Sequence, residues 1–425
     1  MNLTSIAKKL TVCGLLIILV SSVTAQKVIP VDSSHAVTLR VDPSNAMGGN
    51  VSDFFSKVDY IPLETTKESL FGSISQLQIT DDYYIIFDYN THAILIFTKA
   101  GKFHAKIKSS ESSPINNFSL NKWTKQIAFS RDRYKTLTYC NYDGKVVNSI
   151  KLGGETAKDE VGNYSGLNLF SPDKGFTNSW YSDVDSASKD YRVYYRSLIV
   201  FANANHKIYG YGLPFTKAER GLQTLSTGGQ WPISDFGVDT AFFYSKAYDS
   251  SIYTITPNAI TLSYKFIFPL SASLPSDFLS NTDYNKNRIE WIEKHNQAIY
   301  CLTNFFRIGN NLIFRTGIWG GSKEDNLIYN LKTGTTIAYK HIQQDERSYF
   351  MPIYDQTGWT FDNRGILACK DGCLYTSVSA VGMFKAYKDN AEQKVKYPAA
   401  LAEYFKTGSI KDNPAILVLK LKDEL

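Results

Sequence analysis

The chain has 425 residues and a formal net charge of +6, with 28 tyrosines, 25 phenylalanines and 4 methionines. Lys8 and Lys9 account for two of the positive charges, which leaves +4 for the rest of the chain, where the charges are scattered. Nucleic-acid binding calls for a basic stripe or patch, so this charge pattern argues against a nucleic-acid partner. The aromatic content of 14% is typical of strands, because aromatic and β-branched side chains fit a pleated surface.

The first 25 residues have the pattern of a secretory signal peptide. Two lysines precede an apolar stretch from Leu10 to Val20, and small residues up to Ala25 form a cleavage site before Gln26. A lipid anchor would need a cysteine just after the apolar core, whereas Cys13 lies inside it. No later segment is apolar over the roughly 18 residues that a membrane span needs. We therefore expect a protein without a membrane span that is periplasmic, secreted or displayed at the cell surface.

The clearest repeat unit runs from Ser73 to Ile107. Residues 73–79 alternate between polar and apolar, as a half-buried strand does, while Tyr83–Phe87 and Ala93–Phe97 are continuously apolar, as strands buried on both faces are. Phe103–Ile107 completes the unit, and short polar turns separate its four strands. Four antiparallel strands joined in this way form one blade of a β-propeller.

Weaker copies of this unit recur at the spacing expected for propeller blades. They predict an all-β fold, a six-bladed β-propeller, with small helical insertions at Asn281–Gln297 and Ala391–Phe405. The strands expected in the other blades are Ile127–Ser130, Thr136–Cys140, Val146–Ile150, Ser197–Phe201, Ile208–Leu213, Ala241–Ser245, Ser251–Thr256, Ile260–Phe268, Ala298–Phe306, Asn311–Thr316, Asn326–Asn330, Thr335–Ile342, Trp359–Phe361, Gly365–Cys369, Cys373–Ser377 and Pro414–Leu421.

The expected organisation is a signal peptide at residues 1–25, an N-terminal extension at 26–57 and a single propeller domain at 58–425. Radial packing covers the sticky edge and half-exposed faces that a lone four-stranded sheet would leave, and the ring closes if a strand from one end of the chain pairs with a strand from the other. Val58–Leu63 and Ala415–Leu419 have the apolar composition that this role requires. We predict that these two segments pair and close the ring.

The four cysteines that follow the signal peptide are Cys140, Cys301, Cys369 and Cys373. Cys369 and Cys373 flank the sequence Lys370-Asp371-Gly372, which indicates a three-residue hairpin turn with its glycine in the left-handed conformation. Cysteines that face each other across such a turn can form a disulfide in an oxidising compartment, and two free thiols are the alternative. A zinc site would need further Cys or His ligands nearby, so we expect no metal there.

The run Val58–Thr66, followed by Leu70–Ile79 and Asp88–Phe103, resembles the secreted six-bladed propellers of Bacteroidetes. That family is similar in shape to NHL-type propellers and is largely uncharacterised. The resemblance spans Val58–Lys422, implies the propeller fold and supplies no catalytic residues. Because it also implies a bacterial source, we interpret the C-terminal sequence Lys-Asp-Glu-Leu, an endoplasmic-reticulum retention signal in eukaryotes, as a coincidence.

Aromatic and guanidinium groups in expected loops are the candidates for ligand contacts. Such aromatic rings stack on a sugar or a peptide side chain, or else pack between blades. Arginines in a polar turn suit an anionic group, or else lie in a solvated turn. The residues concerned are Arg131, Arg133, Trp180, Tyr181, Trp231 and Trp319, with Trp359 in the same kind of sequence. They favour a non-catalytic binding or interaction module for a small ligand, glycan, peptide or protein.

A metal-dependent lyase or lactonase that uses the central channel is the alternative function. No Gly-x-Ser-x-Gly or His-Glu-x-x-His motif occurs, and the six histidines are dispersed. The aspartates that fall in turns, and that are candidates for a channel metal, are Asp88, Asp132, Asp249 and Asp362. Aspartate in a turn is first of all a turn former, so we expect no metal and no cofactor and assign no catalytic residue.

Overall fold

Strands that are buried on both faces determine how this molecule is built. In the computed structural model, strand β7 (Tyr83–Asp88) places alternate side chains in two different apolar clusters. Ile86 packs in one cluster with Ile416, and its neighbour Ile85 packs in the other with Ile127. Since successive side chains of a strand point to opposite faces, a continuous apolar run requires a neighbouring sheet on each side.

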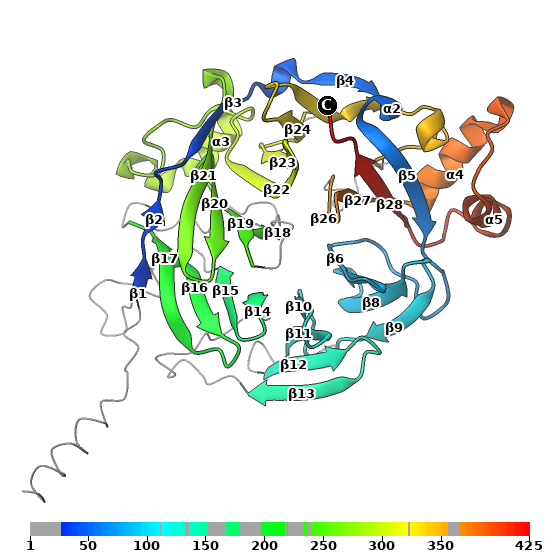
Figure 1. The fold of residues 1–425 in the computed structure, drawn as a ribbon, viewed down its shortest axis with the longest axis horizontal. Helices are drawn as coiled ribbons and strands as arrows, with labels where there is room; N and C mark the ends of the chain where they lie inside the picture. The colour runs from blue at the N-terminus through cyan, green and yellow to red at the C-terminus, as the bar shows by residue number, and fades with distance from the viewer. Residues whose placement is uncertain are drawn as a thin grey trace, which may run out of the picture.

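That requirement is met by six sheets arranged as blades around a central channel (Figure 1). The structure describes residues 27–110, 112–131, 136–151, 167–178, 197–216, 219, 233–235, 240–321, 324–355 and 365–425. Each blade has four antiparallel strands in sequence order from the channel outward, except that the outer strand of the sixth blade comes from near the N-terminus. The prediction of a six-bladed β-propeller is confirmed.

Blades 1 to 3 follow one another along the first half of the chain. Blade 1 consists of β6 (Gln76–Ile79), β7, β8 (Ala93–Thr98) and β9 (Phe103–Ile107). Blade 2 consists of β10 (Ser119–Asn121), β11 (Gln126–Arg131), β12 (Thr136–Asn141) and β13 (Val146–Lys151). Blade 3 consists of β14 (Asn168–Ser171), β15 (Lys174–Asn178), β16 (Ser197–Asn203) and β17 (Ile208–Pro214).

Blades 4 to 6 complete the ring. Blade 4 consists of β18 (Ile233–Asp235), β19 (Phe242–Ser245), β20 (Ser251–Thr256) and β21 (Ala259–Ile267). Blade 5 consists of β22 (Cys301–Ile308), β23 (Asn311–Gly317), β24 (Asn326–Asn330) and β25 (Thr336–Gln343). Blade 6 consists of β26 (Ala368–Lys370), β27 (Cys373–Val378), β28 (Ala415–Leu421) and β5 (Phe55–Pro62). The strand expected at Trp359–Phe361 lies outside the described residues.

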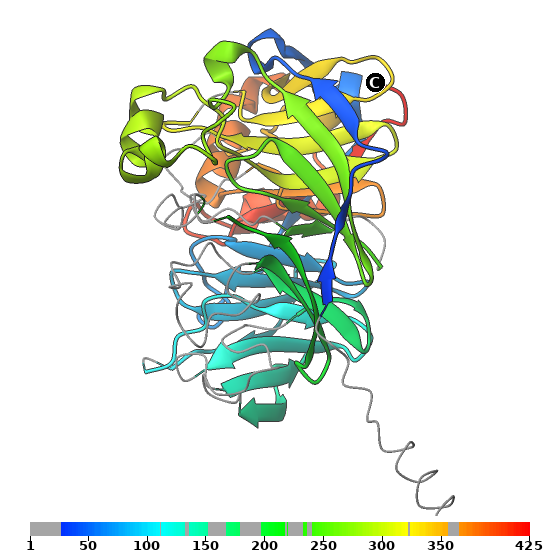
Figure 2. The same cartoon turned by 90° about the vertical axis from the view of Figure 1, so that its left-hand side faces the viewer.

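The residues that precede β5 form a belt around the outside of the ring. This belt consists of β1 (Lys27–Ile29), β2 (Val31–Asp32), β3 (Val37–Arg40) and β4 (Met47–Asn50), followed by the short helix α2 (Val51–Phe54). Its strands pair in parallel with β17, β21 and β25, the outer strands of blades 3, 4 and 5. Figure 2 shows the belt in dark blue as it crosses the outer strands. The belt, residues 27–54, therefore adds strands to three sheets.

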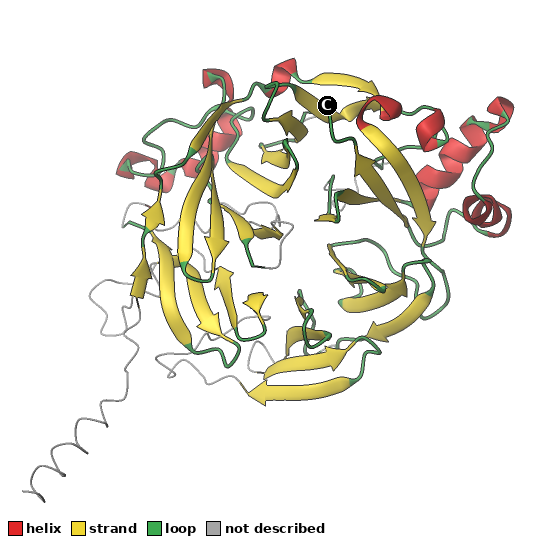
Figure 3. Cartoon of the chain, in the orientation of Figure 1, coloured by secondary structure: helices red, strands yellow, loops and turns green. Residues whose placement is uncertain are grey.

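The helices lie at the periphery of the ring (Figure 3). Blade 4 is followed by a 3-10 helix at Thr282–Lys286 and by α3 (Arg288–Lys294), within the region where a helix is expected. The insertion between β27 and β28 differs from the prediction of one helix at 391–405. It contains α4 (Ala380–Asp389) and α5 (Ala399–Thr407), and Pro398 is the N-cap of α5 because its fixed φ and missing N–H suit a helix start.

The ring closes where β5 pairs in antiparallel register with β28. Pro62 lies opposite Ala415 at one end of the pair and Phe55 lies opposite Leu421 at the other. The predicted pairing of Val58–Leu63 with Ala415–Leu419 is thereby confirmed. Because β5 precedes blade 1 in the sequence and completes blade 6, the closing contact joins segments more than 350 residues apart.

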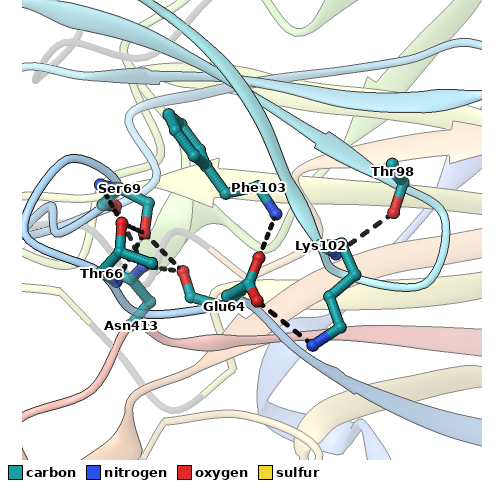
Figure 4. Close-up of polar contacts among 7 residues, drawn as sticks. All are labelled: Glu64, Thr66, Ser69, Thr98, Lys102, Phe103 and Asn413. Atoms are coloured by element: carbon teal, nitrogen blue, oxygen red, sulfur yellow. Dashed lines mark hydrogen bonds and ion pairs between the residues drawn. The ribbon is translucent and has the colours of Figure 1, made fainter.

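The fully buried Asn413 precedes β28 and bonds to the turn that follows β5, at the junction of these two strands, which is called the seam below (Figure 4). Its Nδ2 donates hydrogen bonds to the carbonyl oxygens of Glu64 (2.9 Å) and Ser69 (3.0 Å). Its Oδ1 accepts from the N–H of Phe71 (3.1 Å), and its own N–H donates to Oγ1 of Thr65 (2.8 Å). One side chain thus fixes the turn that leads from β5 into blade 1, with every polar atom of its amide in use.

The carboxylate of Glu64 ties the same turn to the outer strand of blade 1. It accepts hydrogen bonds from the N–H of Phe103 (2.9 Å) and from Nζ of Lys102 (3.2 Å), and the N–H of Glu64 donates to the carbonyl of Gly101 (2.8 Å). Figure 4 shows the contacts of the carboxylate with Phe103 and Lys102. The hydrogen bond from Phe103, together with Lys102, lowers the pKa of Glu64 because both favour the ionised form.

We predict that Glu64→Gln destabilises the protein more at pH 7 than at pH 3. Because the folded-state pKa of Glu64 is lowered, its contribution is present above the unfolded pKa of about 4.3 and is lost as the pH falls through the folded value. Urea unfolding of both proteins at the two pH values measures this difference. The control is Glu403→Gln on α5, whose carboxylate is exposed and lies 3.9 Å from Lys406. A destabilisation by Glu64→Gln that does not change with pH would contradict the prediction.

Candidate functional site

The central channel contains a cavity of about 620 Å³ to which all six blades contribute. Its wall is built from the innermost strands, because these short strands are the ones that converge on the axis of the ring. The lining residues are Gln76–Asp82 from blade 1, Phe118–Leu120, Lys122, Trp123, Lys125 and Tyr142 from blade 2, Leu167–Leu169 from blade 3, Ile233, Ser234 and Phe242 from blade 4, Phe306 from blade 5 and Leu367–Asp371 from blade 6.

Amides and hydroxyls provide the polar groups in the middle of the channel. The side chain of Gln76 bonds to the backbone of Phe118 through both Nε2 (2.8 Å) and Oε1 (3.2 Å), which joins blade 1 to blade 2. Ser234 Oγ accepts from the N–H of Phe305 (3.0 Å), while Gln78 is exposed to the channel. The channel therefore combines polar groups that hold neighbouring blades together with at least one that faces the cavity.

Charged residues gather at the end of the channel formed by the turns between first and second strands. Three aspartates and three lysines line the cavity there: Asp81, Asp82, Asp371, Lys122, Lys125 and Lys370. Lys370 Nζ lies 2.6 Å from Oδ1 of Asp81, and this contact lowers the pKa of the Asp81 carboxyl below its usual value. The equal numbers of acids and bases give the described lining of this end, called the mouth below, no net charge.

Trp123 brings an indole ring to the mouth. It lies in the four-residue turn between β10 and β11, where the side chain of Asn121 accepts from the N–H of Thr124 (3.0 Å) and Lys125 adopts a left-handed φ of 53°. Nζ of Lys122 sits 5.0 Å from the centre of the ring. The ring is partly buried and lines the cavity, which suits a flat, apolar contact with a ligand.

Tyr142 stands beside the mouth at the end of β12. Its ring meets Tyr83 of blade 1 edge-on, with centroids 5.8 Å apart. Burial, followed by the nearby carboxylates of Asp81 and Asp82, raises the pKa of Tyr142 to about 12. The phenol is therefore neutral near pH 7 and acts as a hydrogen-bonding group.

Neither Trp123 nor Tyr142 is among the candidates that sequence reasoning selects. The neighbours of Trp123 in the sequence are Asn, Lys and Thr. Because loops are recognised in a sequence mainly by Gly, Ser and Pro, this tryptophan is not selected as a loop residue. The available signal is a tryptophan inside a short polar turn between two strands, where no core can bury it on all sides.

Two of the candidates from the sequence lie in described regions, and neither lines the channel cavity. Arg131 ends β11 and Trp319 follows β23, so both belong to connections between the second and third strands of a blade. In an antiparallel blade these connections lie at the end opposite to the mouth. Trp319 is 43% exposed. The other candidates, Arg133, Trp180, Tyr181 and Trp231, lie outside the described residues, as does Trp359.

The guanidinium of Arg131 lies over the aromatic ring of Phe129. Its central carbon lies 5.2 Å from the centre of the Phe129 ring, and Nη2 donates to the carbonyl of Lys108 at 3.5 Å. Arg131 therefore connects blade 2 to the segment that follows blade 1.

Asp88 and Asp249, the described members of the metal candidate set, act as turn formers. Asp88 is fully buried, and its carboxylate accepts from the N–H groups of Ser73 (3.2 Å) and Thr91 (3.2 Å) and from the Thr91 hydroxyl (2.6 Å). Asp249 accepts from the hydroxyl of Ser251 at 2.7 Å. Within the described ranges, no three His, Cys, Asp or Glu side chains gather closely enough to hold a metal ion.

A family model for a domain of unknown function, DUF4934, matches residues 36–420. The chain belongs to this family. The match includes most of the belt as well as the ring, so both belong to the DUF4934 unit. No curated protein matches the sequence.

Among solved structures, the DUF4934 chain is similar to a candidate exported protein from Bacteroides fragilis. The TM-score is 0.62 at 16% identity, with 91% of this chain and 100% of that chain covered. A DUF4221 protein from Bacteroides vulgatus (9% identity, 87% and 97% covered, TM-score 0.43) and a streptogramin B lyase (12% identity, 86% and 98% covered, TM-score 0.39) are more distant. At these identities the similarity shows the fold alone.

Cys369 and Cys373 lie on opposite faces of blade 6 and are not bridged in the structure, which is the second of the two alternatives given for this pair. Lys370 pairs with Cys373, which leaves a two-residue turn, Asp371-Gly372, with φ values of 53° and 71°. Left-handed conformations at both positions are typical of the turn preferred by Asp-Gly. The expected three-residue turn is wrong by one position, and a shift of one residue reverses the face of a strand side chain.

We predict that the DUF4934 chain of residues 26–425 titrates as four thiols when it is denatured without a reductant. Cys140, Cys301, Cys369 and Cys373 form no disulfide in the folded protein, and burial raises the pKa of the Cys373 thiol, which keeps it protonated and slow to oxidise. Reaction with a thiol-specific chromophore after denaturation counts them. A reduced sample and Cys369→Ser, with three thiols expected, calibrate the count; two thiols in the untreated protein would show a disulfide.

Proposed function

We propose that this DUF4934 protein is an exported, non-catalytic binding module that holds an uncharged, hydroxyl-rich ligand, a glycan, at the mouth of its channel. The observation that carries this proposal is the partly buried ring of Trp123 beside a mouth with no net charge. A flat aromatic surface stacks on the apolar face of a sugar ring, and nearby polar side chains supply hydrogen bonds to its hydroxyls.

The chemistry of the mouth supports a neutral ligand over an ionic one. The charges of the three aspartates and three lysines that line it sum to zero. One aspartate and one lysine, Asp81 and Lys370, form an ion pair with a distance of 2.6 Å. The Lys122 and Lys125 ammonium groups, the carboxylates of Asp82 and Asp371 and the amide of Gln78 offer both donors and acceptors. An aromatic or amphipathic peptide could also stack on Trp123 and bond to these polar groups, so a peptide is the alternative ligand at this site.

Export is supported by the sequence that precedes the belt. Residues 1–25 have the charged, apolar and small-residue segments of a signal peptide, and β1 begins at Lys27, just after the expected cleavage site. In the part of the chain that the structure describes, no helix is long and apolar enough to cross a membrane. We place the mature protein in the periplasm, in the medium or at the cell surface, with its belt and ring as one folding unit.

No described contact favours the metal-dependent lyase or lactonase. Asp88 and Asp249 hold turns through hydrogen bonds. The residues that line the mouth are instead an amide, an indole and charged side chains of both signs, which suit sugar binding. The binding module is therefore the function that the geometry supports best.

We predict that Trp123→Ala weakens binding of a neutral oligosaccharide at least about tenfold, which corresponds to about 1.4 kcal/mol of lost stacking. A panel of neutral and anionic oligosaccharides and of aromatic peptides, tested by titration calorimetry, identifies the ligand and measures the loss. Trp319→Ala is the matched control, since this exposed indole lies outside the cavity lining. Binding of peptides alone, or an equal loss in Trp319→Ala, would contradict the proposal.

A further inference from the structure

Strand β13, the outer strand of blade 2, is exposed along its whole length. Val146, Val147 and Ile150 are 60%, 49% and 36% exposed, although β-branched apolar side chains are usually covered. One side of β13 pairs with β12, and no described strand pairs with the other side. An outer strand of this kind presents unpaired N–H and C=O groups to any extended chain that reaches it.

The outer strands of blades 3, 4 and 5 are paired with other strands, and those of blades 1 and 6 are in part contacted by other segments. The belt strands β1, β2, β3 and β4 lie against blades 3, 4 and 5. In blade 1, the turn that contains Glu64 bonds to the N–H of Phe103 and the carbonyl of Gly101. In blade 6, β5 packs with α5 in one apolar cluster, which includes Val58 and Leu401. In the part of the chain that the structure describes, β13 is the outer strand that lacks such a cover.

The belt begins one blade away from this uncovered strand. It begins on β17 of blade 3, and the blade that precedes blade 3 in the ring is blade 2 (Figure 1). If the chain is cleaved after Ala25, one residue remains before β1, which is too short to reach β13. Among the residues that the structure describes, no segment of this chain therefore supplies a fifth strand to blade 2.

The composition of β13 indicates which kind of chain fits. Lys145 directly precedes it and Lys151 is its last residue, both are exposed, and no acidic residue or proline lies between them. Inside the strand, the N–H of Ser149 donates to the side chain of Asn148 (2.8 Å), a contact that a partner carbonyl can replace. A matching segment is β-branched in its centre and carries an acidic residue at each end.

A second copy of this chain fits less well. In the antiparallel register centred on Asn148, each Lys145 lies opposite Lys151 of the other copy, and like charges that face each other in a sheet are destabilising. We propose that β13 binds an extended segment of another exported protein, with an apolar β-branched centre and acidic ends, as the fifth strand of blade 2. This mode of binding extends the arrangement that the belt shows on blades 3 to 5.

The probe for this proposal is a synthetic, fluorescein-labelled peptide, capped at both ends, with the sequence Glu-Val-Thr-Val-Thr-Val-Glu. Its partner is the purified full protein, and the control peptide has lysine in place of both glutamates. Fluorescence anisotropy should show saturable binding of the acidic peptide, at least tenfold tighter than that of the lysine peptide. The double variant Lys145→Glu/Lys151→Glu, which alters exposed side chains alone, should reverse this preference.

The matched control is Lys265→Glu on β21, an exposed lysine on an outer strand that the belt already covers. It should bind the acidic peptide as the unchanged protein does. The proposal is overturned if neither peptide binds, if the double variant keeps the original preference, or if Lys265→Glu loses binding equally. Sedimentation that shows a dimer of the unchanged protein, abolished in Val147→Lys, would identify a second copy as the occupant and would also overturn it.

Discussion

The contact between β5 and β28 is the constraint on which the rest of the structure depends. Each blade has two faces to bury, and a blade at the end of an open row would leave one of them in water. By completing blade 6 with a strand that precedes blade 1, the chain gives every blade two neighbours. Joining segments so far apart adds little further entropy cost, because loop closure grows only with the logarithm of loop length.

Asn413 and Glu64 fix how the end of β5 is oriented relative to blade 1. Asn413 fixes the turn after β5, and Glu64 fixes the same turn against blade 1, so the seam is held by directional hydrogen bonds as well as by apolar burial. The innermost strands then converge on one axis, and their turns bring Trp123, Lys370 and Asp81 to a common mouth. The candidate site depends on the closed ring, because six blades that are distant in sequence each contribute a small part of it.

Much of the fold could be predicted from local patterns. Continuous apolar runs such as Ala93–Phe97 indicate strands buried on both faces, and the apolar segments near each end indicate the closing pair. The belt could not be predicted in this way. Its strands have two to four residues, too few to show a period, and they pair in parallel with strands that lie between about 180 and 290 residues away.

The site was less predictable than the fold for two physical reasons. The faces of Cys369 and Cys373 depend on a single residue of turn length, which composition does not determine. The grouping of Trp123 with Lys370 and Asp81 depends on the order of blades around the ring, which a linear pattern does not display.

Hydrogen exchange of individual amides tests the closing role of β5 and Asn413 most directly. If the seam holds the whole ring together, amides of β5 and β28 exchange through the same global unfolding as those of β8, and Asn413→Ala lowers the protection of all three strands together by about 1–3 kcal/mol. Fast exchange of β5 with β8 still fully protected, or a loss of protection in Asn413→Ala confined to the seam, would contradict this account.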